Sequence, residues 1–326
     1  MTSIRDVAKR AEVGATTVSR YLNENGYVSE ESRNKIKEAI KELDYTPNEL
    51  ARNLYRKKSG IVAVLVPDSA HPFFSEFVCH TEMELYKYGY KTMLCNTIRE
   101  NDREREFLDM LKRQMVDGII TGVHTLKDVE KYAGINRPIV ALDRYLSERI
   151  PIVAVDHKRG GALAAHKLID KGCKKVMQFQ GNLDVNTPSH DRHFEFTRIM
   201  KEHGITLIAY TMAWNRFDRN YYEKIVYEAF QEYPDVDGVF GTDLIAANYL
   251  KIALQQGMRV PEDLKIIAYD GTYITNITQP KLTTIVQPIE RLAQETAKLM
   301  VKRIKGKEYK DKKVMLNIIL KEGQTT

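Results

Sequence analysis

Residues 4–23 have the sequence IRDVAKRAEVGATTVSRYLN, which indicates two short helices joined by a tight turn. Ser3 and Asp6 stand at the spacing of a capping signature for the first helix, and Gly14 marks the turn. Apolar residues fall on the inner side of both helices, at Val7, Ala8, Ala11, Val18 and Leu22. Helix, short turn and helix is the arrangement of helix-turn-helix units.

The sequence after this pair indicates a third helix. Ser29 is followed by two acids, Glu30 and Glu31, which favour a first helical turn. The apolar residues of this helix repeat at the helical spacing, at Ile36, Ala39, Ile40 and Leu43. Three packed helices of this size can fold, so we expect residues 1–45 to form a three-helix headpiece.

Residues 46–59, TPNELARNLYRKKS, indicate a very short helix. Thr46 can cap it, Pro47 suits its first position, and Glu49 stands where a capping box has an acid. There is room for only about two turns, and a helix of that length is marginal alone in water. It therefore needs an additional stabilising contact.

From Ile61 onward, apolar runs of strand length alternate with helical stretches. The runs are IVAVLV (61–66), KTMLCN (91–96), GIIT (118–121), PIVAL (138–142), IVAV (152–155), KVMQF (175–179), VDGVFG (236–241) and LKIIAYD (264–270). This alternation is typical of parallel sheets covered by helices on both faces. The length of this region exceeds one ordinary sheet, so we expect two doubly wound lobes with a cleft between them.

We expect the two lobes to be discontinuous in sequence. Residues 60–155 and 289–315 should form the first lobe, and residues 156–288 and 316–326 the second. The run VMLNIILK, residues 314–321, should return as a strand to the second lobe.

The totals describe a globular chain of 326 residues, with 43% hydrophobic residues and a net charge of +6. The charge permits an anionic partner without requiring one. Cys79, Cys95 and Cys173 are widely separated, which favours a reducing compartment and no metal site. The N-terminus MTSIRDVAKR lacks the apolar run of a secretory signal, and no segment approaches about 18 apolar residues. We expect a soluble, cytoplasmic protein.

Motifs of the enzyme classes that use such sheets are missing from the sequence. There is no GxGxxG after the first strand, no GxxxxGK[ST] and no GxSxG. We therefore expect no catalytic residue, no cofactor and no enzymatic activity, although the fold class alone excludes none of them.

The outer side of the second helix is suited to DNA. Its side chains are small or polar, namely Ala15, Thr16, Thr17, Ser19, Arg20 and Asn23. Arg20 can pair with guanine in the major groove, while Thr17, Ser19 and Asn23 can reach phosphates. Residues 1–59 contain twelve Lys or Arg and nine Asp or Glu, an excess of only three positive charges. Composition therefore leaves a plain solvated helix face as an equal alternative.

The order of the residues is more informative than their composition. IRDVAKRAEVGATTVSRYLN and VSEESRNKIKEAIKELDYTPNELARNL (residues 28–54) closely resemble the N-terminus of the lactose/galactose repressor family of bacterial transcription regulators. The resemblance implies an α/β protein with a helix-turn-helix headpiece and a two-lobed core like that of periplasmic binding proteins. Glu12 and Gly14 depart from the family, which usually has Gly and Ser there.

In that family the segment matching 46–59 is a hinge helix, which forms when a homodimer inserts it into the minor groove of a near-palindromic operator. The resemblance thus adds Thr2, Asn48, Ala51 and Leu54 to the expected DNA contacts, with Leu54 as the wedge between base pairs. The alternative is a plain linker with a helical tendency. No leucine heptad is present in the terminal sequence KEGQTT, so we expect a dimer.

Polar and aromatic residues follow the predicted strands, where ligands of such sheets bind. The family resemblance implies an effector cleft with Phe73 and Phe74 as its apolar wall, Asp143, Arg192 and Asp270 as polar contacts, and Trp214 and Thr242 beside them. Carboxylates accept paired hydroxyls and aromatic faces pack on C–H surfaces, which suits a sugar. The two phenylalanines and Trp214 could instead be core residues. Asp243 is expected to cap the following helix.

Two further stretches, LDRYLSERIPIVAVDHKRGGALAAHKLI (142–169) and NTPSHDRHFEF (186–196), look most like sucrose-operon repressors of low-GC Gram-positive bacteria. The implied function is repression of a sugar operon, with sucrose, its phosphate or fructose as effector. Arg144, His157 and His190 could meet a phosphate, although surface exposure is the commoner state of such residues.

Two alternatives remain from the sequence. One is a regulator of the same family controlled by a phosphorylated carrier protein, docking on EFVCHTEMELYKYGY (76–90). The other is a transport-type sugar-binding protein, which would need export and would leave the headpiece without a role.

Overall fold

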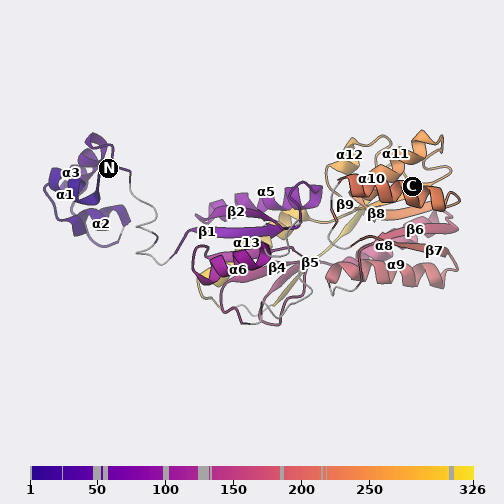
Figure 1. The fold of residues 1–326 in the computed structure, drawn as a ribbon, viewed down its shortest axis with the longest axis horizontal. Helices are drawn as coiled ribbons and strands as arrows, with labels where there is room; N and C mark the ends of the chain where they lie inside the picture. The colour runs from indigo at the N-terminus through magenta and orange to yellow at the C-terminus, as the bar shows by residue number, and fades with distance from the viewer. Residues whose placement is uncertain are drawn as a thin grey trace. The chain divides into compact units, whose positions relative to one another are not determined.

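The computed structural model describes residues 2–23, 25–46, 53, 58–97, 103–123, 132, 134–183, 187–213, 216–217, 219–307 and 312–326. The chain forms two compact units, Met1–Gly60 and Ile61–Thr326 (Figure 1). Of the expected hinge helix, only residues 46, 53, 58 and 59 are among those described, so this prediction lies outside the described residues.

The first unit is the predicted three-helix headpiece, with α1 Ile4–Arg10, α2 Ala15–Asn23 and α3 Glu30–Glu42. The capping box at α1 is present: Ser3 Oγ accepts from the Asp6 main-chain N–H, and Asp6 accepts from that of Ser3. Ser29 caps α3, because its Oγ accepts from the Ser32 main-chain N–H. Local signals in the sequence therefore set where these helices begin.

The headpiece core contains the predicted apolar residues, with Val7, Val18 and Ile36 fully buried. In the turn between α1 and α2, Glu12 has a φ of 55°. This left-handed conformation favours glycine, because a β-carbon crowds the main chain there. The departure from the family's glycine thus places a strained residue in the turn.

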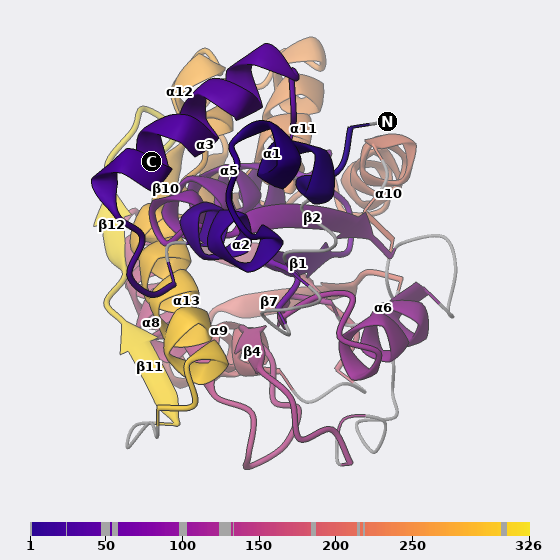
Figure 2. The same cartoon turned by 90° about the vertical axis from the view of Figure 1, so that its left-hand side faces the viewer.

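The first lobe of the second unit is built on a sheet ordered β2-β1-β3-β4-β5-β11 among the described strands. Their bounds are β1 Ile61–Val66, β2 Lys91–Asn96, β3 Gly118–Thr121, β4 Ile139–Leu142, β5 Ile152–Val155 and β11 Lys313–Leu316. Helices α5 Pro72–Lys87 and α13 Ile289–Ile304 pack on one face, and α6 Arg103–Lys112 packs on the other. Figure 2 shows α13 beside β11.

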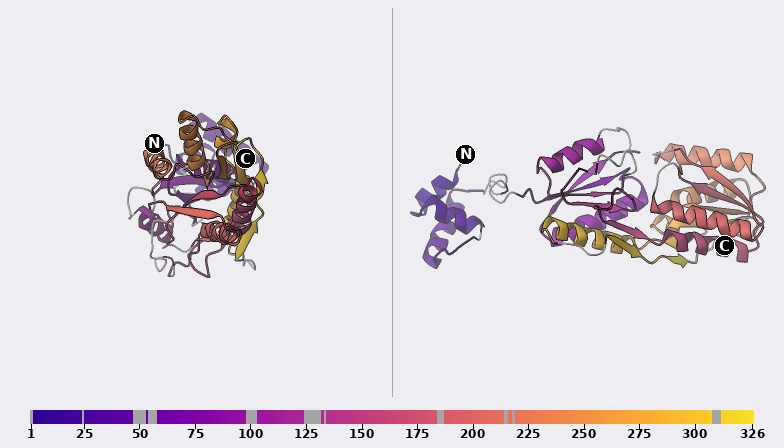
Figure 3. Two further views of the ribbon diagram at one scale, coloured as in Figure 1. Left: turned by 90° about the vertical axis from the view of Figure 1, so that its right-hand side faces the viewer. Right: turned by 90° about the horizontal axis from the view of Figure 1, so that it is seen from below.

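The second lobe repeats this plan, with the order β7-β6-β8-β9-β10-β12. Its strands are β6 Lys175–Gln180, β7 Thr206–Thr211, β8 Gly238–Thr242, β9 Lys265–Asp270, β10 Thr283–Val286 and β12 Ile319–Lys321. Its helices are α8 His157–Asp170, α9 Asp191–Glu202, α10 Arg219–Glu232, α11 Asp243–Gln255 and the short α12 Ile274–Ile277, with a 3-10 turn η1 Pro188–His190. Helices α8 and α9 pack on one face, and α10 and α11 on the other (Figure 3).

Within the described residues, the chain passes between the lobes at three places: from β5 to α8, from β10 to α13, and from β11 to β12. The prediction that residues 314–321 return to the second lobe is wrong for its first half. β11 pairs in parallel with β5 of the first sheet, and only β12 joins the second sheet, antiparallel to β10.

All eight apolar runs predicted as strands contain strands, but β7 and β10 were not predicted. β7 lies at the sheet edge and is only partly buried, as is β2 of the first sheet, which was predicted. β10 is four residues long and buries two threonines, Thr283 and Thr284, which a search for apolar runs does not find.

Candidate functional site

Helix α2 presents the surface that the sequence assigned to DNA. Thr2, Ala15, Thr16 and Arg20 are exposed, and Thr17, Ser19 and Asn23 are partly exposed. Asn23 Nδ2 donates to the Ser19 main-chain oxygen at 2.9 Å, which ties the end of the helix. The other predicted DNA contacts, Asn48, Ala51 and Leu54, lie outside the described residues.

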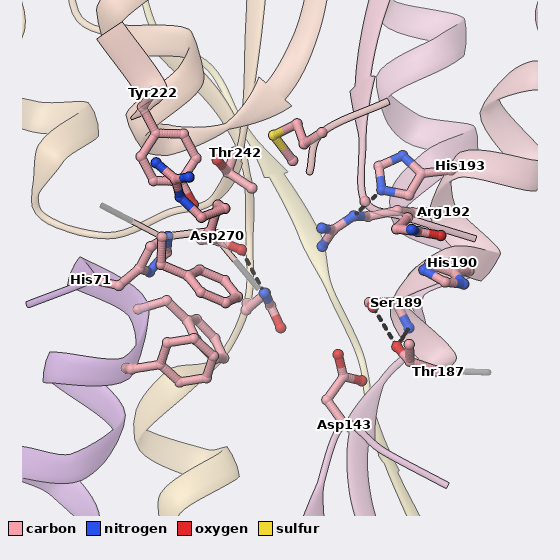
Figure 4. Close-up of a pocket in the computed structure, with 18 of the residues that line it drawn as sticks. His71, Asp143, Thr187, Ser189, His190, Arg192, His193, Tyr222, Thr242 and Asp270 are labelled. Carbon is pink, nitrogen blue, oxygen red and sulfur yellow. Dashed lines mark hydrogen bonds between the residues drawn. The ribbon is translucent and has the colours of Figure 1, made fainter. Parts of the chain in front are cut away.

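A pocket between the two lobes brings together six of the seven predicted effector residues (Figure 4). They are Phe73, Phe74, Asp143, Arg192, Thr242 and Asp270. The seventh, Trp214, lies outside the described residues. The first lobe provides the residues that follow β1 and β4, while the second lobe provides those around α9 and at the ends of β8 and β9.

Aromatic rings form one wall of the pocket. His71, which precedes α5, has its ring centroid 5.6 Å from Phe74, 6.0 Å from Phe217 and 6.3 Å from Tyr222. Phe73 packs edge-on against Phe74 at 5.3 Å. Both phenylalanines also belong to the buried core, so the two roles considered for them are compatible.

Asp270 lies at the end of β9 on the polar side of the pocket. It is buried and has a φ of 117°, and its Oδ1 accepts from Gln287 Nε2 at 2.8 Å. Burial raises the pKa of Asp270 to about 6, although the Arg192 charge and the Gln287 hydrogen bond favour the ionised form. A carboxyl held in such a place is a strong acceptor for a ligand's hydroxyl groups.

Asp243 does not cap α11, contrary to the prediction. Thr242 is the residue before the helix, and the Asp243 carboxyl instead accepts from the Thr272 main-chain N–H at 2.6 Å and hydroxyl at 2.7 Å. It also accepts from the Thr284 hydroxyl at 3.2 Å. Burial, then the nearby Asp270 charge, raises the pKa of Asp243 well above its usual range. Asp243 thus secures the loop after β9.

Asp143 and Arg192 both make contacts that hold them in the pocket. Asp143, at a φ of 52°, has its Oδ1 2.8 Å from His157 Nε2. The Arg192 guanidinium carbon lies 4.2 Å from the Tyr269 ring centroid, and Arg192 Nε donates to His193 Nε2 at 3.2 Å.

The expectation that Arg144, His157 and His190 are exposed is wrong, because all three are buried. Arg144 donates to the main-chain oxygen of Val123, and His157 contacts Asp143. Tertiary partners therefore account for the burial of these two side chains. Of the three, only His190 lines the pocket.

Several polar atoms around the pocket are buried without a hydrogen-bond partner among the described residues: His71 Nδ1, His193 Nδ1 and Thr242 Oγ1. Burial lowers the pKa of His71 to about 4 and that of His193 well below its usual range, so both rings are neutral near pH 7. Buried polar atoms normally have partners, and each exception calls for an explanation. In Figure 4, His71 and Asp270 face Arg192 and His193 across the pocket.

Apart from His190, which the sequence suggested as a phosphate contact, sequence reasoning did not assign the rest of the lining: His71, Gly181, Asn182, Thr187, Ser189, His193, Met212, Ala213, Arg216, Phe217, Tyr222 and Gln287. Position after a predicted strand was an available signal for some of them. His71 lies in the segment after β1, and Gly181 and Asn182 directly follow β6. Gln287 directly follows β10, which was not predicted, so this signal was not available for it.

Among the described residues, no group of three or more His, Cys, Asp or Glu side chains is placed to hold a metal ion. The helices that the structure describes are all too short or too polar to cross a membrane.

Two family descriptions match the chain. "Bacterial regulatory proteins, lacI family" matches residues 3–48, and "Periplasmic binding protein-like domain" matches residues 165–326. The first covers the headpiece and the second covers the second lobe together with the C-terminal part of the chain.

Among curated proteins, the chain is similar to the ribose operon repressor of Halalkalibacterium halodurans, with 40% identity over 94% of this chain and 92% of that one. It is also similar to the sucrose operon repressor of Streptococcus mutans, with 37% identity over 92% of each chain. Among solved structures, a LacI family transcriptional regulator from Enterococcus faecium with bound ribose has 30% identity and a TM-score of 0.69, over 82% of this chain and 98% of that one.

Proposed function

Because the chain belongs to the lacI family of bacterial transcriptional regulators, we propose that it is a repressor of a sugar-utilisation operon. A homodimer binds a near-palindromic operator, and a sugar in the pocket between the lobes releases it. The protein acts in the cytoplasm, by binding and not by catalysis.

The observation that carries this proposal is the set of unpaired polar atoms around a pocket with an aromatic wall. A sugar presents C–H faces to rings and hydroxyl groups that both donate and accept. Its hydroxyls are suited to pair with His71 Nδ1, Thr242 Oγ1 and His193 Nδ1, which lack partners among the described residues. Binding then removes the penalty of leaving buried polar atoms unpaired.

We assign the polar contacts to residues at both sides of the pocket. Asp143 and Asp270 accept from sugar hydroxyls, Arg192 donates to them, and Phe73 and Phe74 pack on the sugar's C–H surface. Thr242 lies beside these groups, and Trp214 stays a prediction outside the described residues.

Two sugars are the leading candidates for the effector. The sequence features of residues 142–169 and 186–196 favour sucrose, whereas the 40% identical relative is named a ribose operon repressor. The pocket lining pairs two carboxyl groups, Asp143 and Asp270, with two arginines, Arg192 and Arg216. With no excess positive charge, this lining favours a neutral sugar over a phosphate ester.

On the DNA side, the exposed face of α2 supports major-groove reading by Arg20, with Thr16, Thr17 and Ser19 beside it. A dimer places two such helices on two half-sites. The hinge residues Asn48, Ala51 and Leu54 would bind the minor groove between them.

The test combines a sugar titration with an operator titration. An operator is selected from random duplexes, and its affinity is measured by fluorescence anisotropy with and without ribose, sucrose, fructose and their phosphate esters. A coupling of about 1–3 kcal/mol lowers operator affinity about 5- to 150-fold when the effector is present. If no sugar changes operator affinity, or if a sugar tightens it, the proposed mode of control is wrong.

A further inference from the structure

Two residues that do not line the pocket connect two residues that do. His157 Nδ1 lies 2.7 Å from the Tyr269 hydroxyl, and His157 Nε2 lies 2.8 Å from Asp143 Oδ1. Arg192 covers the other side of this group, with its guanidinium carbon 4.2 Å from the Tyr269 ring centroid. Asp143 and Arg192 belong to the pocket, whereas His157 and Tyr269 are buried behind it.

The chemistry of these side chains determines which atom donates each hydrogen bond. A carboxylate only accepts hydrogen bonds, so His157 Nε2 carries the proton and donates to Asp143. Burial raises the pKa of Tyr269, which keeps its hydroxyl protonated, while the Arg192 guanidinium lies over its ring. In the tautomer with its proton on Nε2, His157 presents Nδ1 as an acceptor, and the Tyr269 hydroxyl donates to it.

This series of contacting side chains includes residues of both lobes. Asp143 directly follows β4 of the first lobe, whereas Tyr269 lies on β9 and Arg192 on α9 of the second. His157 is the first residue of α8, at one of the connections between the lobes.

The fit around Tyr269 is close. A β-carbon on Gly160 would lie only 2.8 Å from the Tyr269 hydroxyl oxygen, so this position on α8 leaves no room for a side chain. The hydroxyl is therefore held against the main chain of α8, next to His157. Dense packing of this kind transmits small displacements instead of absorbing them.

We infer that His157 and Tyr269 are positioning residues of the sugar site, which hold Asp143 of the first lobe and Arg192 of the second at the separation that the sugar must match. The inference rests on the proposed function. We call the series Arg192–Tyr269–His157–Asp143 the relay. The relay fixes the position of one lobe relative to the other around the bound sugar. A sugar that moves either end then changes the hydrogen bonds of the other.

The first test removes one hydroxyl. Tyr269→Phe keeps the ring beneath Arg192 but deletes the central link, and Tyr249→Phe is the matched control at a buried tyrosine on α11. Binding of ribose and of sucrose to the full-length protein is measured by calorimetry. We expect Tyr269→Phe to weaken binding about 10-fold or more and Tyr249→Phe to stay within about 2-fold. Equal affinities of the two variants would overturn the inference.

The second test separates a positioning role from simple filling of space. His157→Gln keeps a donor and an acceptor side by side, whereas His157→Leu keeps the bulk alone. We expect Gln to restore most of the sugar affinity that Leu removes. If the two variants bind sugar equally, the hydrogen bonds of His157 have no positioning role.

A third measurement needs no sugar. In 15N-histidine-labelled protein, the His157 signals, identified by their loss in His157→Gln, should show a protonated Nε2 and an unprotonated Nδ1. Tyr269→Phe should shift the Nδ1 signal. A ring protonated at Nδ1 overturns the relay. If wild-type protein binds none of the sugars, the proposed function fails, and these spectra still decide whether the relay exists.

Discussion

Gly161 of α8 packs directly against the main-chain carbonyl of Arg192 on α9, so that a β-carbon at position 161 would overlap that oxygen. The position of Arg192 in the pocket thus depends on a residue without a side chain. Gly161→Ala should push α9 outward, lower stability by about 1–3 kcal/mol and weaken sugar binding. Gly134→Ala is the control, because a β-carbon there meets nothing within 4 Å. Urea unfolding and calorimetry check both effects, and unchanged sugar binding in Gly161→Ala would contradict the expectation.

Asp270→Asn should separate ligand binding from stability. The folded pKa of about 6 lies above the unfolded value of about 3.9, so the stability that protonated Asp270 provides at low pH is lost as pH rises through 6. The amide of asparagine does not ionise, so the variant does not lose this stability as pH rises. We expect the variant to gain about 2 kcal/mol relative to wild type between pH 4 and pH 7 while losing sugar binding. Urea unfolding at both pH values measures the gain, and a pH-independent difference would exclude this role for Asp270.

His71→Phe should alter acid stability in the opposite direction. His71 has a folded pKa of about 4, below the unfolded value of about 6.5, because it is buried. As pH falls from 6.5 to 4, the unfolded chain binds a proton that the folded protein does not, and wild type loses about 3 kcal/mol. Phenylalanine has no such proton. Between pH 7 and pH 4.5, the variant should therefore lose less unfolding free energy than wild type. His166→Gln, at an exposed histidine, is the control.

Glu12→Gly should stabilise the headpiece by about 1 kcal/mol, because glycine adopts the φ of 55° without crowding. Glu12→Ala is a sharp control: it removes the same charge but keeps a β-carbon. Hydrogen exchange of the main-chain amides in α1 and α2 reports the local unfolding free energy. A gain of equal size in Glu12→Ala would assign the effect to charge and not to backbone strain.

Arg20→Ala should weaken operator binding by about 1–3 kcal/mol and relax the preference at one base pair in each half-site. Arg10→Ala removes an equal charge from a side chain that pairs with Glu42 at 2.6 Å, and serves as the control. Both variants are titrated against operator and against random duplex. If they lose the same affinity on both DNAs, Arg20 does not read a base.

Local signals made the headpiece predictable from sequence. Ser3 and Ser29 cap helices through neighbours three residues away, and the helical spacing of apolar residues defines the core. Strand prediction succeeded for the buried apolar strand β1 and also for the partly exposed edge strand β2. It failed for β10, which is rich in threonine, and for β7, which is exposed to a similar degree as β2.

The pocket was predictable where a residue follows a recognised strand. Asp143 and Asp270 follow or end β4 and β9, whereas Gln287 was missed because β10 was missed. The aromatic wall joins His71 to Tyr222, two residues far apart in sequence that only the tertiary fold brings together. The same holds for the burial of His157, whose partners Asp143 and Tyr269 no local pattern identifies.

The connections between the lobes have a consequence for biosynthesis. A ribosome delivers β1 to β5 long before β11, so the first sheet lacks an edge strand until residues 313–316 have emerged. The second sheet waits longer, since β12 and the Thr325 carbonyl that pairs with Ile266 come last. Each lobe is therefore completed only after residues 313–325 have emerged, whereas domains generally fold as units during synthesis. A nascent chain stopped before residue 313 would lack one strand of each sheet, so that β5 and β10 would be edge strands.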